Sequence, residues 1–183
     1  MHEPDTTTQQ LLSATRSSLL DTGMCTATAC SVALHNDAPY ILGSEQENYL
    51  AAQLLNTTKA AAIIVAKPAC SVDTVIFNHY HDCDDLSPRD SESQSSLHSI
   101  PLIRRGNNTL QLITEALKKR KGCLVEGVGI ISLSAIAIDQ AAIHWSSVYH
   151  ALSIQAMVSS MQTKHRSDHM DPFWEHHLQP APT

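Results

Sequence analysis

The sequence predicts a single α/β domain with a mainly antiparallel sheet flanked by helices. Segments with helical spacing and caps alternate with short apolar segments typical of strands. A length of 183 residues suits one compact domain, and a hydrophobic fraction of 43% with a charged fraction of 16% is typical of globular chains. We expect residues 1–6 to be disordered, residues 7–163 to form the domain and residues 164–183 to form a partly ordered tail.

Four segments have the patterns of helices. Each combines apolar residues at spacings of three and four with a boundary residue that begins or ends a helix. Thr22-Gly23 ends the first helix, Ser44 begins the second, and Ser134 begins the long last one. The expected helices cover residues 7–21, 44–55, 109–119 and 134–162.

Six segments are apolar, β-branched and bounded by turn residues, as strands are. Residues 57–66 combine alanines that favour a helix with Ile63-Ile64-Val65, which favours a strand, so both stay open there. Residues 82–99 are rich in Asp, Ser and Glu, and predict a mobile surface loop long enough to act as a lid. The expected strands cover residues 25–34, 40–43, 73–81, 100–103, 122–125 and 128–133.

The strand predicted over residues 73–81 ends in His79 and His81. Side chains alternate between the two faces of a strand, so the two imidazoles would point the same way. That arrangement is typical of two ligands of one metal ion. The alternative interpretation is two polar side chains at the end of a strand.

Charge and composition exclude several classes of partner. The net charge is −6 without a basic block, and aromatic residues make up 4%, which argues against nucleic acid and anionic membrane surfaces. The 5 cysteines form no CxxC pair, so neither a zinc ribbon nor a disulfide framework is indicated. The first ten residues are polar, without the apolar segment of a signal peptide, and we expect a cytoplasmic protein.

Residues 10–162 resemble the class II aldolase/adducin-type family, most clearly over residues 100–157. His79-Tyr80-His81 resembles the family's His-x-His strand, Glu126-Gly127 its His-Gly step, and residues 19–24 the end of its first helix. The resemblance implies a three-layer fold in which helices flank the central sheet. It also implies lyase or isomerase chemistry through a metal-bound enediolate, and a homotetramer with active sites at subunit interfaces.

Departures from the family pattern define the expected site. Glu126 occupies the position of the third metal histidine, which implies a site of two imidazoles and one carboxylate. Cys30 and Ser31 occupy the position of the Gly-Asn pair that binds phosphate, so we expect these residues to contact an unphosphorylated, fairly apolar carbonyl substrate.

The residues that transfer protons are also altered. The family's catalytic glutamate falls near Asn56, which we take as a substrate contact, with Glu45 and Glu47 close to it in the sequence. Glu126 lies inside an apolar segment, where an acidic side chain suits a ligand or a general acid and base. Tyr49 is a second candidate catalytic residue.

Three functions remain open at this point. The first is a lyase or isomerase with one divalent ion, Zn²⁺ by first choice or Mn²⁺, held by His79, His81 and Glu126. The second is a non-haem Fe²⁺ oxygenase on the same ligands, since two histidines and one carboxylate form the usual set for that metal. The third is a metal-free cyclase, or a non-catalytic assembly protein like the adducin heads.

Overall fold

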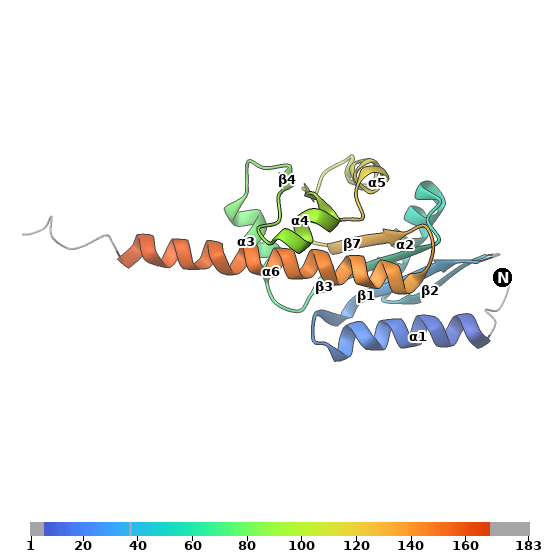
Figure 1. Ribbon diagram of the computed structural model, residues 1–183. Coiled ribbons are helices and arrows are strands. Elements are labelled where there is room, and N and C mark those ends of the chain that lie inside the picture. The colour runs from blue at the N-terminus through green and yellow to red at the C-terminus, as the bar shows by residue number, and fades with distance from the viewer. Residues whose placement is uncertain (1–5, 37, 169–183) are drawn as a thin grey trace, which may run out of the picture.

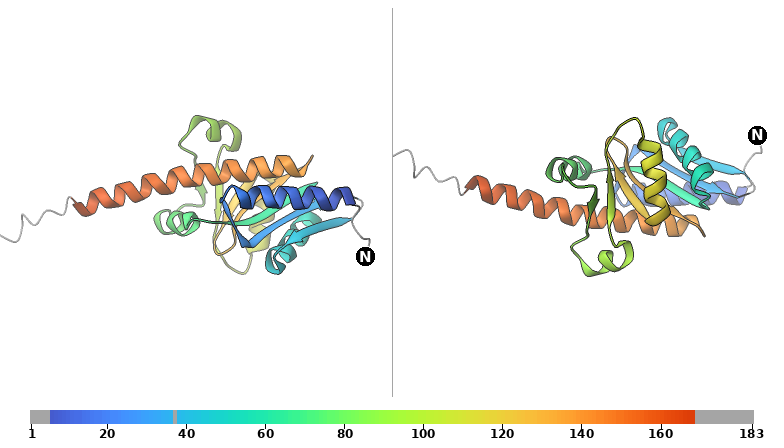
Figure 2. Two further views of the ribbon diagram at one scale, coloured as in Figure 1. Left: turned by 90° about the horizontal axis from the view of Figure 1, so that it is seen from below. Right: turned by 90° about the horizontal axis from the view of Figure 1, so that it is seen from above.

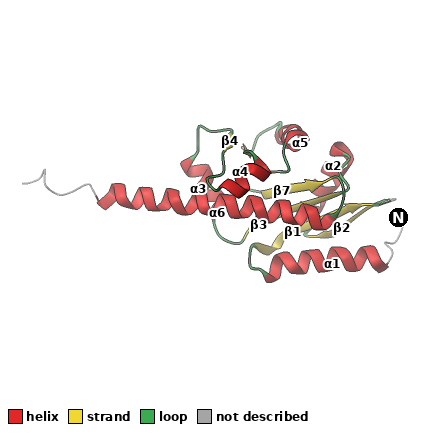
Figure 3. Ribbon diagram, in the orientation of Figure 1, coloured by secondary structure: helices red, strands yellow, loops and turns green. Residues whose placement is uncertain are grey.

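The computed structural model describes residues 6–36 and 38–168, and these residues form a seven-stranded sheet between two layers of helices (Figures 1 and 3). The expected three-layer α/β architecture is confirmed. The predictions for residues 1–5 and for the tail from residue 169 lie outside the described residues. Among the helices that the structure describes, none combines the length and the apolar character that a membrane crossing requires.

The strands are ordered β2-β1-β3-β7-β6-β5-β4, and every neighbouring pair is antiparallel except β5 and β6. The helices are α1 (Thr6–Asp21), α2 (Glu45–Thr58), α3 (Val72–His79), α4 (Ser91–Leu97), α5 (Thr109–Lys119) and α6 (Ile138–Asp168). The strands are β1 (Cys25–His35), β2 (Pro39–Gly43), β3 (Ala62–Pro68), β4 (Asp85–Leu86), β5 (Ile100–Ile103), β6 (Gly122–Val125) and β7 (Gly129–Ser134).

Two hydrophobic clusters cover the two faces of the sheet. On one face α1 and α6 lie side by side, joined by α3 and α4, and on the other face lie α2 and α5 (Figure 2). Trp145 fixes α6 to the sheet: it is fully buried and donates its indole N–H to the Ile130 carbonyl at 3.2 Å. The C-terminal part of α6 continues past α3 and away from the sheet (Figure 1).

The prediction of a strand over residues 73–81 is wrong, because these residues form α3 and the start of the segment that follows it. Val72, Ile76 and Phe77 recur at helical spacing and are buried against the core that α6 shares. Residues 57–66, for which helix and strand both stayed open, contain the end of a helix and the start of a strand. Helix α2 ends at Thr58, Lys59 turns the chain with φ of 58°, and β3 begins at Ala62.

The mobile surface loop predicted over residues 82–99 proves to contain secondary structure. Strand β4 and helix α4 form within it, and Leu86 and Leu97 are buried in the core. Asp90 begins α4, and its carboxylate accepts a hydrogen bond from the Ser93 N–H at 2.7 Å. A cap and two buried leucines are enough to order a segment that is polar elsewhere.

We expect Asp90→Ala to loosen α4, at a cost of about 0.5–2 kcal/mol as for other helix caps. The Ser93 N–H lowers the pKa of Asp90, so the cap contributes stability above the ordinary carboxyl pKa and loses it as the pH falls below about 4. Hydrogen exchange of residues 91–97 measures the effect. Asp90→Asn, which keeps an oxygen acceptor, should protect these amides more than Asp90→Ala does, and equal protection in both variants contradicts the cap.

Candidate functional site

The β1–β2 hairpin meets the start of α2 at Gly43, where two strands approach more closely than a side chain permits. A Cβ atom on Gly43 would lie 2.3 Å from the Cys30 carbonyl oxygen and 2.5 Å from the Ser31 Cα. Only glycine allows this contact, because both obstructing atoms belong to the backbone. The contact brings Cys30 and Ser31 directly beside the first turn of α2.

Four residues around this contact form what we call the hairpin–helix cluster: Cys30, Ser31, Ser44 and Asn48. The Cys30 N–H donates to the Ser44 hydroxyl at 3.2 Å. The Ser31 hydroxyl donates to the Asn48 side-chain oxygen, and the Asn48 amide donates in turn to the Gly43 carbonyl at 3.1 Å. The side chains of the cluster thus bond one another and fix α2 to the hairpin.

Arg16 and two cysteines give this region its electrostatic character. The Arg16 guanidinium donates to the carbonyls of Cys30 at 3.2 Å and Ala27 at 2.9 Å. The hydrogen bond between the two thiols lowers the pKa of Cys30 and raises that of Cys25, and the charge of Arg16 lowers the pKa of both. Of the two thiols, Cys30 is therefore the one that loses its proton more readily.

A cavity of about 190 Å³, which we call the turn cavity, lies between α2 and the turn that joins β6 to β7. Tyr49 has 69% of its surface exposed, and its hydroxyl accepts a hydrogen bond from Gln53 at 3.1 Å. Gly129, with φ of 116°, lies so close to β3 that a Cβ there would be 2.6 Å from the Ala66 carbonyl oxygen. The cavity is lined by Gln46, Glu47, Tyr49, Leu50, Gln53, Gly127 and Val128.

The three predicted metal ligands do not come together within one chain. His79 ends α3, where its ring contacts the Tyr80 ring at 5.0 Å, and the exposed His81 pairs with Asp82 at 2.8 Å. Glu126 accepts a hydrogen bond from the Arg105 N–H at 3.2 Å. Residues 6–36 and 38–168 hold no group of three or more His, Cys, Asp or Glu side chains that could bind a metal ion.

The position of β3 explains this outcome. The strand that precedes the two histidines is β3, which lies beside β7 and ends at Pro68, before α3 begins. Strand β3 contains no histidine. The Lys67 ammonium lies there instead, 4.0 Å from the Asp73 carboxylate. The strand argument for a metal pair at His79 and His81 therefore does not hold.

The other predicted residues divide into two groups. Cys30 and Ser31 lie in the hairpin–helix cluster and Tyr49 lines the turn cavity, whereas Asn56 is exposed in the last turn of α2.

Two residues of this region were not predicted from the sequence. Asn48 makes the hydrogen bonds to Ser31 and Gly43 at the start of α2. Its signal in the sequence is its place four residues after the helix-starting Ser44. Arg16 was missed as well, and only the packing of α1 against β1 reveals it.

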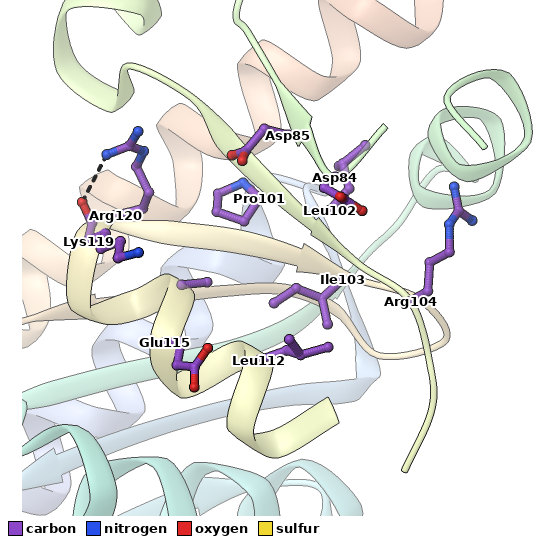
Figure 4. A pocket seen from close by; sticks show the side chains of 11 residues that line it. Asp84, Asp85, Pro101, Leu102, Ile103, Arg104, Leu112, Glu115, Lys119 and Arg120 are labelled. Carbon is purple, nitrogen blue, oxygen red and sulfur yellow. Dashed lines mark hydrogen bonds between the residues drawn. The ribbon is translucent and has the colours of Figure 1, made fainter. Parts of the chain in front are cut away.

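A second cavity, of about 450 Å³, lies between α5 and the edge formed by β4 and β5 (Figure 4). Pro101, Ile103 and Leu112 give it an apolar floor, and the side chains of Arg104 and Lys119 lie at opposite ends of it (Figure 4). None of the residues predicted as a site lines this cavity. We therefore place the candidate site at the turn cavity.

Comparisons with known proteins identify the fold. No family model matches the chain, and no curated protein matches it in sequence. L-fuculose-1-phosphate aldolase from Thermus thermophilus is similar in structure, with a TM-score of 0.67 and 16% identity over 83% of this chain and 96% of that one. YgbL from Escherichia coli, described as a putative aldolase/epimerase/decarboxylase, has a TM-score of 0.65 and 11% identity over 81% and 87% of the two chains. An aldolase II superfamily protein from Pseudomonas syringae has a TM-score of 0.55 and 9% identity over 80% of this chain and 72% of that one.

We expect Gly43→Ala to separate β2 from β1 and to break the hydrogen bonds of the hairpin–helix cluster. Overpacking of this kind costs about 1–3 kcal/mol, which denaturant unfolding measures as a lower midpoint. Gly106→Ala is the matched control, because a Cβ on Gly106 meets nothing within 4 Å. Equal unfolding midpoints for the two variants would show that the contact at Gly43 is not constrained.

Proposed function

We propose, from the class II aldolase fold of this chain, that it is a lyase or isomerase acting on an unphosphorylated, fairly apolar carbonyl compound. The observation that carries the proposal is the turn cavity, which both Glu47 and Tyr49 line. A carboxylate and a hydroxyl donor are the two groups that enolisation requires. Leu50 and Val128 add an apolar wall for the remainder of the substrate.

Two features disfavour a phosphorylated substrate. The donors of the hairpin–helix cluster are used within the chain, since Ser31 donates to Asn48 and the Cys30 N–H donates to Ser44. The first turn of α2 carries Glu45 and Glu47, whose charges repel a phosphate from the helix N-terminus that would otherwise attract it. A neutral carbonyl oxygen avoids this repulsion.

In the proposed reaction, the Glu47 carboxylate removes a proton from the carbon next to the carbonyl group. The C–H electrons form a C=C bond, and the carbonyl oxygen gains negative charge, which a hydrogen bond from the Tyr49 hydroxyl stabilises. Isomerisation of a hydroxyketone is completed when Glu47 returns the proton to the former carbonyl carbon and the hydroxyl proton passes to the former carbonyl oxygen. In the lyase direction, Glu47 instead removes the proton of the hydroxyl group on the β-carbon, the C–C bond breaks to give an aldehyde and an enolate, and Glu47 returns that proton to the enolate carbon.

The divalent ion implied by the resemblance would polarise the substrate carbonyl when bound. The ligands predicted for it, His79, His81 and Glu126, do not form a group within one chain over the described residues, and the two histidines lie at and just after the end of a helix rather than on a sheet strand. Zn²⁺, with Fe²⁺ and Mn²⁺ as alternatives, stays a prediction, and no step is assigned to it. Glu126 remains a candidate acid or base next to the turn cavity.

We expect the protein to catalyse deuterium exchange at the carbon next to the carbonyl group of unphosphorylated hydroxyketones in D₂O. Proton NMR measures the exchange rate. Glu47→Gln should lower kcat about 10²–10⁴-fold through loss of the base, and Tyr49→Phe about 10²–10³-fold through loss of the donor. The matched control is Glu45→Gln, on the same turn of α2 but outside the turn cavity.

Exchange that survives in Glu47→Gln and Tyr49→Phe at the rate of the control would refute this site. Elemental analysis of the untagged protein, repeated on the double variant His79→Ala/His81→Ala, tests the metal prediction in the same preparations. The proposal expects equal metal content and equal exchange with and without the two histidines. If the parent binds stoichiometric metal, and the double variant loses both the metal and the activity, then metal chemistry replaces the steps assigned above.

We propose that the predicted self-association, to a homotetramer by family resemblance, uses the exposed side of α6. From residue 140 to residue 163 the sequence contains no Asp, Glu, Lys or Arg. Met157 and Met161 are 60% and 63% exposed, and Ile143 is 63% exposed on the same helix. A water-facing stretch of helix that lacks these charged residues over 140–163 and has three large exposed apolar side chains is typical of an interface.

Charges introduced on this surface should separate the subunits. We expect the double variant Met157→Lys/Met161→Lys to reduce the particle mass in light scattering, because burying two unpaired ammonium groups is costly. Thr74→Lys/Asn78→Lys adds the same charge at exposed positions of α3 and should keep the parent mass. A parent protein that is already monomeric at micromolar concentration would refute the interface.

A further inference from the structure

We propose that Cys25 and Cys30 form a reversible disulfide, so that β1 carries a site of oxidative modification next to the start of α2. The inference concerns the dithiol itself and does not depend on the reaction proposed above. Five cysteines occur in the sequence, and the structure brings these two together as buried neighbours within one strand. Their separation along the chain alone would not predict this.

A bulge in β1 creates the pair. Along a regular strand, Cys25 and Cys30 would lie about 16–17 Å apart and would point to opposite faces, since their separation is odd. In the pairing with β3, Cys25 lies opposite Pro68 and Cys30 lies opposite Ala66. A step of five residues along β1 thus matches a step of only two residues along β3. The two cysteines therefore occupy adjacent positions on one face, and both belong to the core beneath α1 and α6.

This spacing suits a covalent bond. Two residues that lie opposite positions i and i+2 of the neighbouring strand have Cα atoms about 6–7 Å apart. This range overlaps the Cα separation of about 4.4–6.8 Å found in disulfides. The pKa of each thiol is shifted chiefly by the other thiol, in agreement with this short separation. Closing the bond thus requires a small approach of the two sulfur atoms rather than a rearrangement of the sheet.

The pair is chemically asymmetric, as reactive dithiols are. The hydrogen bond from Cys25 and the charge of Arg16 lower the pKa of Cys30, which makes Cys30 the nucleophile and Cys25 the resolving thiol. Cys123 provides the contrast, because it is fully buried without such partners and burial raises its pKa. The inert thiol and the activated thiol lie on opposite faces of the same sheet.

The oxidation is balanced with a hydroperoxide as the oxidant. The Cys30 thiolate attacks the terminal oxygen, the O–O bond breaks, and protonation releases water or an alcohol and leaves a sulfenic acid on Cys30. The Cys25 thiol then attacks that sulfur, forms the S–S bond and expels water. Two thiols are oxidised, one peroxide is reduced, and a small thiol reverses the step by exchange.

The backbone around the pair provides access for a small oxidant. Ala27 and Thr28 in the bulge are exposed, and the β3 partner of Cys25 is Pro68, which has no N–H to donate. This end of β1 is held chiefly by Arg16 and by the Ala69 N–H, which donates to the Met24 carbonyl at 2.9 Å. Local opening of the bulge can therefore expose the sulfur atoms without unfolding the sheet.

The test uses the full chain with the exposed thiols removed by Cys70→Ser/Cys83→Ser. Samples are equilibrated in glutathione buffers of increasing potential, alkylated and digested with trypsin. The peptide from Ser17 to Lys59 contains Cys25 and Cys30 and no other cysteine, so the disulfide lowers its mass by two hydrogens and blocks alkylation. We expect the equilibrium constant for disulfide formation to be at least tenfold larger in the native chain than in the urea-unfolded chain. This factor corresponds to a reduction potential lower by about 30 mV.

Three variants complete the design. Cys25→Ala and Cys30→Ala should abolish the mass change, and Cys123→Ala, equally buried, should behave as the parent. After hydrogen peroxide treatment, dimedone should label Cys30 in Cys25→Ala several-fold more than Cys25 in Cys30→Ala, because Arg16 remains on the Cys30 carbonyl when the partner thiol is removed. The proposal fails if the native peptide stays reduced across the series, if the unfolded chain forms the bond as readily, or if the two labelling levels are equal.

Discussion

The close approach of β2 to β1 at Gly43 is the constraint on which the rest of the candidate site depends. A Cβ there would collide with the backbone of Cys30 and Ser31, so glycine alone lets the hairpin close onto the start of α2. That closure sets the contacts of Ser44 and Asn48, and with them the direction in which α2 leaves the hairpin. The position of α2 beside the turn cavity follows from this single contact.

Much of the fold could be predicted from the sequence, because its signals are local. The helix ending at Thr22-Gly23, the strands over residues 25–34 and 40–43 and the strands on each side of Glu126-Gly127 were predicted from caps, turns and apolar spacing, and the structure confirms them. The α/β class and the mainly antiparallel sheet follow from their order. Residues 82–99 were misjudged because Leu86, Leu97 and the Asp90 cap are few among many polar residues.

The candidate site could be predicted less well, because it depends on which strands become neighbours. His79-Tyr80-His81 matches the pattern of a metal-binding strand, yet the preceding Val72, Ile76 and Phe77 match a helical face equally well, and packing against α6 decides for the helix. The strand beside β7 is β3, whose residues left helix and strand open in the sequence. The bulge that pairs Cys25 with Cys30 also exists only in the register between β1 and β3.

The central claim is that the start of α2 and the β6–β7 turn enclose the substrate. Crystals soaked with a set of unphosphorylated aliphatic and aromatic hydroxyketones test it most directly. The account predicts ligand density in the turn cavity, with the carbonyl oxygen within hydrogen-bond distance of the Tyr49 hydroxyl and the adjacent carbon next to the Glu47 carboxylate. Density only in the cavity between α5 and β5, or a metal ion bound by His79 and His81 with the ligand upon it, would contradict the account.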